Sequence, residues 1–97
     1  MGFERDLAEC LEVMAEVAGG LGEDHRAARL WGAAGALRKA TDNPWLLFER
    51  RLHQPYLAAA RSRMEDADWT QAWEEGWAMT LDEAVSYALE GEQGGGG

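Results

Sequence analysis

Apolar residues recur along this chain at spacings of three and four positions, and no stretch alternates in the manner of a strand. Residues three or four positions apart lie on the same face of an α-helix, so the pattern predicts an all-helical chain. Pro44 and Pro55 are its two prolines. We therefore expect an all-α fold of about five helices in antiparallel pairs, either a small bundle or the end of a helical repeat array.

The first predicted helix runs from about Glu4 to Val17. It should end at the sequence GGLGED, because glycines cost helix stability and permit left-handed caps. Cys10 lies on the apolar side, where a thiol acts as a small hydrophobe rather than as a nucleophile. The predicted buried face consists of Phe3, Leu7, Cys10, Leu11, Met14 and Val17.

The second predicted helix begins at His25, with Asp24 as its cap, and ends near Ala40. Gly32 and Gly35 lie inside it, where each costs about 0.5 to 1 kcal/mol relative to alanine. We therefore expect a neighbouring helix to approach closely at these glycines. The predicted core face consists of Ala27, Leu30, Trp31, Ala34 and Leu37.

The third predicted helix extends from Trp45 to about Met64 and contains Pro55. A proline inside a helix removes a backbone hydrogen bond, so we expect either a kink or two shorter helices joined at His53 and Gln54. The predicted core face consists of Trp45, Phe48, Leu52, Tyr56, Leu57, Ala60 and Met64.

The sequence WTQAWEEGW places three tryptophans four residues apart on a helix predicted from about Asp66 to Ala78. Residues at that spacing drift by about 40° around a helix, so all three share one narrow stripe. We expect Trp69 and Trp73 to pack in the core, where the small Gly76 lets another helix approach. We expect Trp77 to be partly exposed and to anchor a protein contact, because tryptophan is common among such anchors.

The stretch from Thr80 to Glu83 matches a capping box and predicts a fifth helix that ends near Glu90. Residues 91–97 are glycine-rich and acidic and predict a flexible tail, so residues 1–90 are expected to form a single helical domain. The predicted buried face of the last helix consists of Leu81, Ala84, Val85, Ala88 and Leu89.

The formal net charge of −9 is unevenly distributed. Residues 1–24 carry seven acids and one base, residues 25–63 carry eight bases and two acids, and residues 64–97 carry nine acids and no base. An acidic chain repels phosphate backbones, so we do not expect nucleic-acid binding. The candidate basic patch consists of Arg26, Arg29, Arg50, Arg51, Arg61 and Arg63. Its first two members share a helix face and could receive an acidic helix such as the first one.

Several classes of function lack the residues that they need. No apolar stretch approaches the roughly 20 residues that cross a bilayer, and the acidic start lacks a secretory signal, so we expect a cytoplasmic protein without membrane contact. His25, His53 and Cys10 are too few ligands for a zinc cluster. Adjacent carboxylates on a helix, such as Glu74 and Glu75, point about 100° apart and do not converge on one substrate atom. We therefore expect a protein that is not an enzyme and that needs no cofactor or metal.

Two stretches, RAARLWGAAGALR at 26–38 and AWEEGWAMTLDEAVSYALE at 72–90, resemble a known family. They are similar to the C-terminal helical region of large bacterial ATPase-linked regulators, which include LuxR-type transcriptional activators and cyclase- or kinase-linked P-loop ATPases. The resemblance spans about Leu7 to Glu90 and implies the end of a tetratricopeptide-like array that serves as a scaffold or sensor. The chain departs from the family at Trp77, where arginine is usual, and at Pro55.

These observations predict a non-catalytic protein–protein interaction or capping module of a bacterial signalling or transcription-regulating protein. Helical repeats cannot bury their apolar faces alone, so the expected partner is a preceding repeat or a second copy in a homodimer. The residues predicted to contact the partner are Trp77, Arg26, Arg29, Arg50 and Arg51. The alternative is a small-molecule sensor with a pocket between helices, lined by tryptophans and by the polar groups of Tyr56, His53 and Tyr87.

Overall fold

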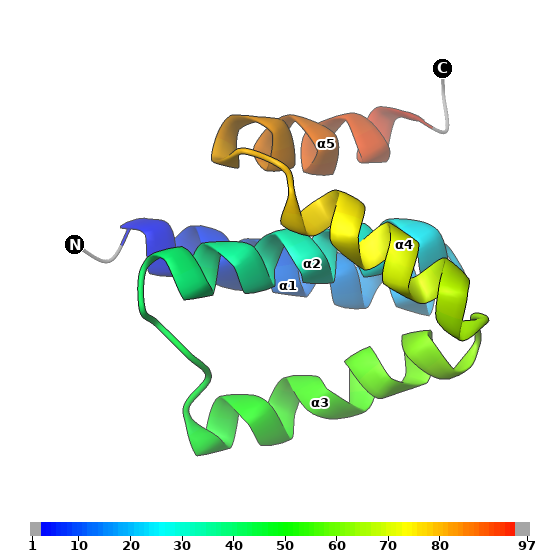
Figure 1. The fold of residues 1–97 in the computed structure, drawn as a ribbon, viewed down its shortest axis with the longest axis horizontal. Helices are drawn as coiled ribbons and strands as arrows, with labels where there is room; N and C mark the ends of the chain where they lie inside the picture. The colour runs from blue at the N-terminus through cyan, green and yellow to red at the C-terminus, as the bar shows by residue number, and fades with distance from the viewer. Residues whose placement is uncertain (1–2, 95–97) are drawn as a thin grey trace.

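The computed structural model describes residues 3–94 and gives the side chains of residues 6–89. Its helices are α1 (Phe3–Gly20), α2 (Asp24–Ala40), α3 (Leu47–Ser62), α4 (Asp66–Trp77) and α5 (Leu81–Gly94). No strand occurs within residues 3–94, which confirms the predicted all-α fold. Figure 1 shows α2 in the middle, with α1 behind it and α4 in front, while α5 and α3 lie on opposite sides of this central group.

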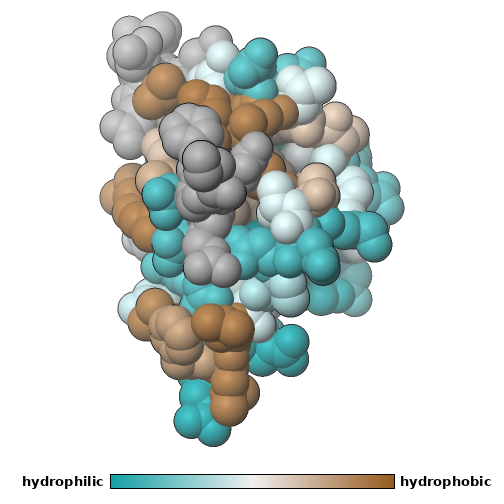
Figure 2. Space-filling model, turned by 90° about the vertical axis from the view of Figure 1, so that its left-hand side faces the viewer, coloured by the Kyte–Doolittle hydropathy of each residue, from teal (hydrophilic) through white to brown (hydrophobic). Residues whose placement is uncertain are grey.

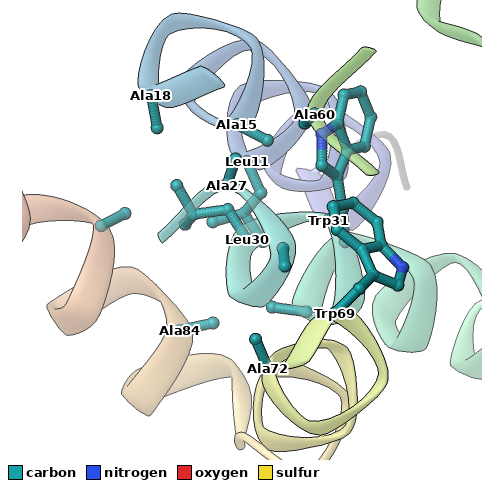
Figure 3. Packing of buried hydrophobic residues seen from close by; sticks show 14 residues of the cluster. Leu11, Ala15, Ala18, Ala27, Leu30, Trp31, Ala60, Trp69, Ala72 and Ala84 are labelled. Carbon is teal, nitrogen blue, oxygen red and sulfur yellow. The ribbon is translucent and has the colours of Figure 1, made fainter. Parts of the chain in front are cut away.

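The central position of α2 follows from its composition of small residues, which let other helices approach on several sides. Leu30 and Trp31 are its largest fully buried apolar side chains. Figure 3 shows them surrounded mostly by alanines from the neighbouring helices, together with Trp69. The predicted core face of this helix is confirmed, except that Leu37 is only partly buried.

The contact between α2 and α4 is a backbone contact between two glycines and the opposing chain. A Cβ atom on Gly76 would overlap the backbone carbonyl of Arg29, and one on Gly32 would overlap the backbone carbonyl of Trp73. A Cβ atom on Gly35 would meet only tryptophan rings, at 3.3 to 3.6 Å. The close approach predicted at the glycines of α2 is therefore confirmed, and any larger residue at the first two positions would push the helices apart.

The buried face of α1 differs from the predicted one. Cys10 and Val17 are exposed, and the predicted stop after Val17 is wrong because α1 continues to Gly20. The chain turns instead at Gly22, whose φ of 83° is the left-handed conformation that favours glycine. The side chain of Phe3 lies outside the described side chains. The residues that α1 buries are Ala8, Leu11, Glu12, Ala15 and Ala18.

This difference has a physical reason. The alanines of α1 face the alanine-rich surface of α2, where small residues on both helices allow close packing. The buried carboxylate of Glu12 is compensated by Arg38 of α2, which lies far away in the sequence. A pattern that counts only apolar residues therefore misplaces the face of α1.

Two other helix boundaries differ from the prediction. The cap of α2 is Glu23 rather than Asp24, and Glu23 makes no side-chain cap bond. Asp24 lies in the first turn, where its carboxylate accepts a hydrogen bond of 3.0 Å from Arg63 Nε. α3 begins at Leu47 and continues through Pro55 as one helix, so the second of the two alternatives expected at Pro55, a division into two shorter helices, is wrong. Pro55 is exposed, and its ring stands on the solvent side of α3.

The capping box at the start of α5 is confirmed. The backbone N–H of Thr80 donates to the Glu83 carboxylate at 2.9 Å, and the backbone N–H of Glu83 donates to the Thr80 hydroxyl at 3.1 Å. α5 extends to Gly94, beyond the end predicted near Glu90, and residues 95–97 of the predicted tail lie outside the described residues.

Replacing Thr80 with alanine should lower the free energy of unfolding by about 1 kcal/mol, because one backbone donor at the start of α5 loses its acceptor. Urea titration followed by circular dichroism measures the change. Thr70→Ala is a matched control, since Thr70 is exposed within α4 and caps no helix. Equal stabilities of the two variants would contradict the role of the box.

Candidate interaction site

The inner side of α3, which faces α1 and α2, is charged and polar rather than apolar. The buried residues of α3 are Glu49, His53 and Ala60. A helix on the surface of a globular domain normally turns its apolar stripe inward. The first half of α3, with Glu49 and His53, therefore has the reverse of the usual arrangement, whereas Ala60 and the half-buried Leu57 of its second half pack against the core.

The outer side of α3 carries large apolar side chains. Phe48, Leu52 and Tyr56, which we call the α3 stripe, are 66%, 58% and 55% exposed, and Leu47 beside them is 66% exposed. Their spacing of four residues aligns the stripe along one side of the helix. Figure 2 shows hydrophobic residues gathered over the beginning of α3, at the lower end of that view. The prediction that these three residues belong to the core is wrong.

The side chains beneath α3 form a cluster around the carboxylate of Glu12, which is 1% exposed. Arg38 of α2 donates two hydrogen bonds to it, from Nε at 2.6 Å and from Nη2 at 3.0 Å. The indole Nε1–H of Trp45 donates a third, at 2.8 Å. This bidentate, charge-assisted geometry is the kind that can compensate the burial of two charges.

Glu49 and the loop before α3 complete the surroundings of Arg38. The Glu49 carboxylate lies 3.6 Å from Arg38 Nη2, and it also accepts the backbone N–H of Leu46 at 2.9 Å. Arg38 Nη1 donates to the backbone carbonyl of Asn43 at 3.0 Å. Burial alone would lower the pKa of Arg38, but the hydrogen bonds and the attraction of Glu12 and Glu49 outweigh it and raise the pKa. Arg38 therefore stays charged.

His53 connects α3 to α1 directly. Its Nδ1 lies 2.5 Å from Glu16 Oε2, and its Nε2 lies 3.6 Å from Glu12 Oε1. The imidazole stacks on the Trp45 ring, with centroids 5.3 Å apart, and meets the edge of Trp31 at 6.1 Å. Ion pairs and aromatic contacts thus determine which side of α3 faces the domain. Glu12 and Arg38 were not predicted from the sequence, where their only signal was a charged residue on each buried helix face.

Arg26 and Arg29, which were predicted to contact a partner, are bound inside the domain. Arg26 donates to the backbone carbonyls of Tyr87 and Ala88, at 3.3 and 2.8 Å. Arg29 donates to the Glu75 carboxylate at 2.8 Å and to the Tyr87 hydroxyl at 3.3 Å. These bonds raise the pKa of Arg29, and the hydrogen bond from Arg29 lowers the pKa of Glu75. The two arginines hold α5 and α4: Arg29 receives an acidic helix as expected, but that helix is α4 rather than α1.

The other predicted contact residues are exposed but do not lie together. Arg50 and Arg51 are exposed on α3, and Arg51, three positions after Phe48, borders the α3 stripe. Trp77 is 40% exposed and stacks on Trp73 with centroids 6.4 Å apart. It ends α4, which rises away from α3 in Figure 1. The predicted burial of Trp69 and the partial exposure of Trp77 are confirmed, whereas Trp73, which was also expected in the core, is only partly buried.

Two hollows bear on the sensor alternative. A hollow of about 250 Å³ lies between α3 and α4, and one of about 190 Å³ lies between α1, α2 and α5. Sites for small molecules usually measure about 300 to 1,000 Å³. Trp69 and Trp73 line the first hollow, but the three polar groups proposed for a sensor line neither. These three groups lie far from one another. His53 belongs to the buried cluster, Tyr56 lies on the exposed α3 stripe, and the ring of Tyr87 is covered by the guanidinium of Arg26.

The described residues hold neither a candidate metal site nor a helix that could span a membrane. Within that part of the chain, no group of three or more His, Cys, Asp or Glu side chains is arranged to hold a metal ion. The helices of the same part are too short or too polar to cross a membrane.

Fold and site together define an all-helical domain in which α3 is joined to α1 and α2 by charged and polar side chains and carries an apolar outer face. We call this inner contact the charged seam; it consists of Glu12, Glu16, Arg38, Glu49 and His53. The chain is similar to a segment of proteins named "Putative HTH-type transcriptional regulator" from Mycobacterium bovis and from two strains of Mycobacterium tuberculosis. Identity is 36% over 85 residues, which is 88% of this chain and 10% of each relative. The chain thus spans about a tenth of the length of these curated relatives. No family model and no solved structure matches it.

Proposed function

We propose that this chain is a non-catalytic protein–protein interaction module of a bacterial transcription-regulating protein, and that it binds through the α3 stripe. The observation that carries the proposal is the exposure of Phe48, Leu52 and Tyr56 along one side of a helix. Contiguous apolar surface of this kind marks interaction sites in proteins. An apolar helix face typically packs against another helix or enters a groove.

The charged seam beneath α3 supports this proposal, because it prevents the domain from burying the stripe itself. Turning the stripe inward would separate His53 from Glu16 and Glu49 from Arg38, and would set large apolar side chains against the buried charges of Arg38 and Glu12. Each of these buried charged groups would lose a polar partner, and that loss offsets the gain from burying the apolar stripe. The stripe therefore remains available to a different surface.

The comparisons support a regulatory setting. The matched segment is a small part of each relative, so the DNA contact implied by the relative's name need not involve this segment. The net charge of −9 disfavours a phosphate backbone, and Arg26, Arg29, Arg38 and Arg63 are already bound to acceptors within the domain. We therefore place this segment in contact with protein, including neighbouring helical repeats, and give it a capping or scaffolding role.

A photo-crosslinking amino acid at Leu52, in the full-length protein in its host cell, tests this function. We expect a covalent adduct with a protein surface, identified by mass spectrometry. Gln54 is the matched control, since it is exposed on the same helix but points about 160° away from Leu52. The same probe at Trp77 tests the second predicted anchor. Absence of a protein adduct at Leu52, or equal adducts at Leu52 and Gln54, would overturn the proposal.

A further inference from the structure

We propose that the partner of the α3 stripe is a second copy of this chain, seated so that α3 of each protomer lies along α1 of the other. The inference rests on the proposed interaction function and names its partner. It follows from a second apolar stripe, from the charges beside the two stripes and from the direction of the two helices.

α1 carries an exposed apolar stripe of its own. Val13 and Val17 are 50% and 56% exposed, and Cys10 beside them is also exposed. We call these three residues the α1 stripe. Their spacing of three and four positions places them on one side of the helix. The domain thus leaves two helices with uncovered apolar sides.

The two stripes border the same seam. His53 of α3 meets Glu16 of α1 across it, while Leu52 precedes His53 and Val17 follows Glu16. The opposite side of α3, with Leu57, faces α4 across the larger hollow. Both stripes therefore lie on the side of the molecule that faces away from α4, where one partner could cover them together.

The exposed charges beside the stripes have opposite signs. Beside its stripe α1 exposes Asp6 and Glu9, whereas the exposed charge that borders the α3 stripe is Arg51. Arg50 points about 160° away from Leu52, and Arg61 lines the hollow that faces α4. Packing α3 on α3 would bring arginines together, and packing α1 on α1 would bring carboxylates together. Packing α3 on α1 brings opposite charges together, which favours this pairing and disfavours the other two.

A closed dimer can make this pairing twice. α1 and α3 run in the same direction, both from the side of the N-terminus in Figure 1. A two-fold axis parallel to these helices places α3 of each protomer against α1 of its partner. A two-fold axis perpendicular to the helices, in the plane of the interface, would instead pair α1 with α1 and α3 with α3. Charge therefore selects the first arrangement, which is isologous and closes at two copies.

The test is the molar mass of the 97-residue chain, measured by light scattering at micromolar to submillimolar concentration. We expect the wild-type chain to dimerise. Leu52→Asp and Val13→Asp should each weaken the dimer about a hundredfold or more, since each symmetric dimer would bury two unpaired carboxylates. Gln54→Asp, which adds the same charge on the opposite side of α3, should leave the dimer unchanged.

Mixing the two aspartate variants gives the decisive measurement. A heterodimer of Leu52→Asp with Val13→Asp retains one intact contact between α3 and α1, whereas each variant alone retains none. We therefore expect mass to rise towards the dimer in the mixture. If like helices paired instead, both contacts of the mixed dimer would carry a substitution, whereas each homodimer would keep one intact contact, so mixing would bring no recovery. Circular dichroism checks folding, and serine replaces aspartate in any variant that loses helicity.

Three results would overturn the inference: a wild-type chain that stays monomeric, aspartate variants that remain dimeric, or a mixture that does not associate. These results leave the proposed function standing if the crosslinker at Leu52 captures a different protein. The function itself falls if that crosslinker captures no protein, or if the control at Gln54 gives an equal adduct.

Discussion

Replacing Arg38 with methionine is expected to lower the free energy of unfolding by about 3 to 5 kcal/mol, because the buried Glu12 carboxylate would lose its charged partner. Natural domains of this size are stable by about 5 to 15 kcal/mol, so such a loss would bring the variant close to unfolding. Urea titration followed by tryptophan fluorescence measures the change. Lys39→Met is the matched control, since Lys39 is the exposed neighbour at the same end of α2 and should change stability little.

The double variant Arg38→Met/Glu12→Met separates loss of the pair from loss of packing. Removing both charges leaves no orphaned ion, so the double variant should be more stable than the Arg38→Met single variant. A double variant whose loss equals the sum of the two single losses would show that Arg38 and Glu12 are energetically independent, contrary to their two hydrogen bonds.

Replacing Gly76 with alanine is expected to cost about 3 kcal/mol or more, because the new methyl group overlaps the backbone carbonyl of Arg29. Alanine has the better helix propensity, by about 1 kcal/mol, so a net loss would report the close contact of α4 with α2. Thermal and urea unfolding would both register the loss.

Gly20→Ala is the matched control for Gly76→Ala. Gly20 lies in the last turn of α1, and a Cβ atom there meets nothing within 4 Å. We expect this variant to be unchanged or slightly more stable, since only propensity acts. If Gly76→Ala were as stable as Gly20→Ala, the backbone contact between α2 and α4 would be refuted.

The parts of the fold that depend on local rules could be predicted from the sequence. The capping box at Thr80 needs only residues three positions apart, and the stripe of α2 is apolar on the side that is buried. The glycines of α2 predicted a close contact, although the pattern could not say that Gly76 of α4 would face Arg29.

The faces of α1 and α3 could not be predicted in this way. Helical periodicity shows that Phe48, Leu52 and Tyr56 share a side, but tertiary contacts decide whether that side is inside. In α3 they favour the other side, because Glu49 and His53 have partners on α2 and α1 that are distant in sequence. Among the predicted contact residues, Arg51 and Trp77 are exposed, whereas Arg26 and Arg29 are engaged by α5 and α4.

The charged seam beneath α3 has a consequence for association. Hydrogen bonds and stacked rings are directional, so they hold α3 in one rotation about its own axis. A purely apolar interface would allow several such rotations. A binding partner therefore meets side chains that are already oriented for docking. Less conformational freedom remains to be lost when the complex forms, and a modest apolar area can then yield a useful affinity.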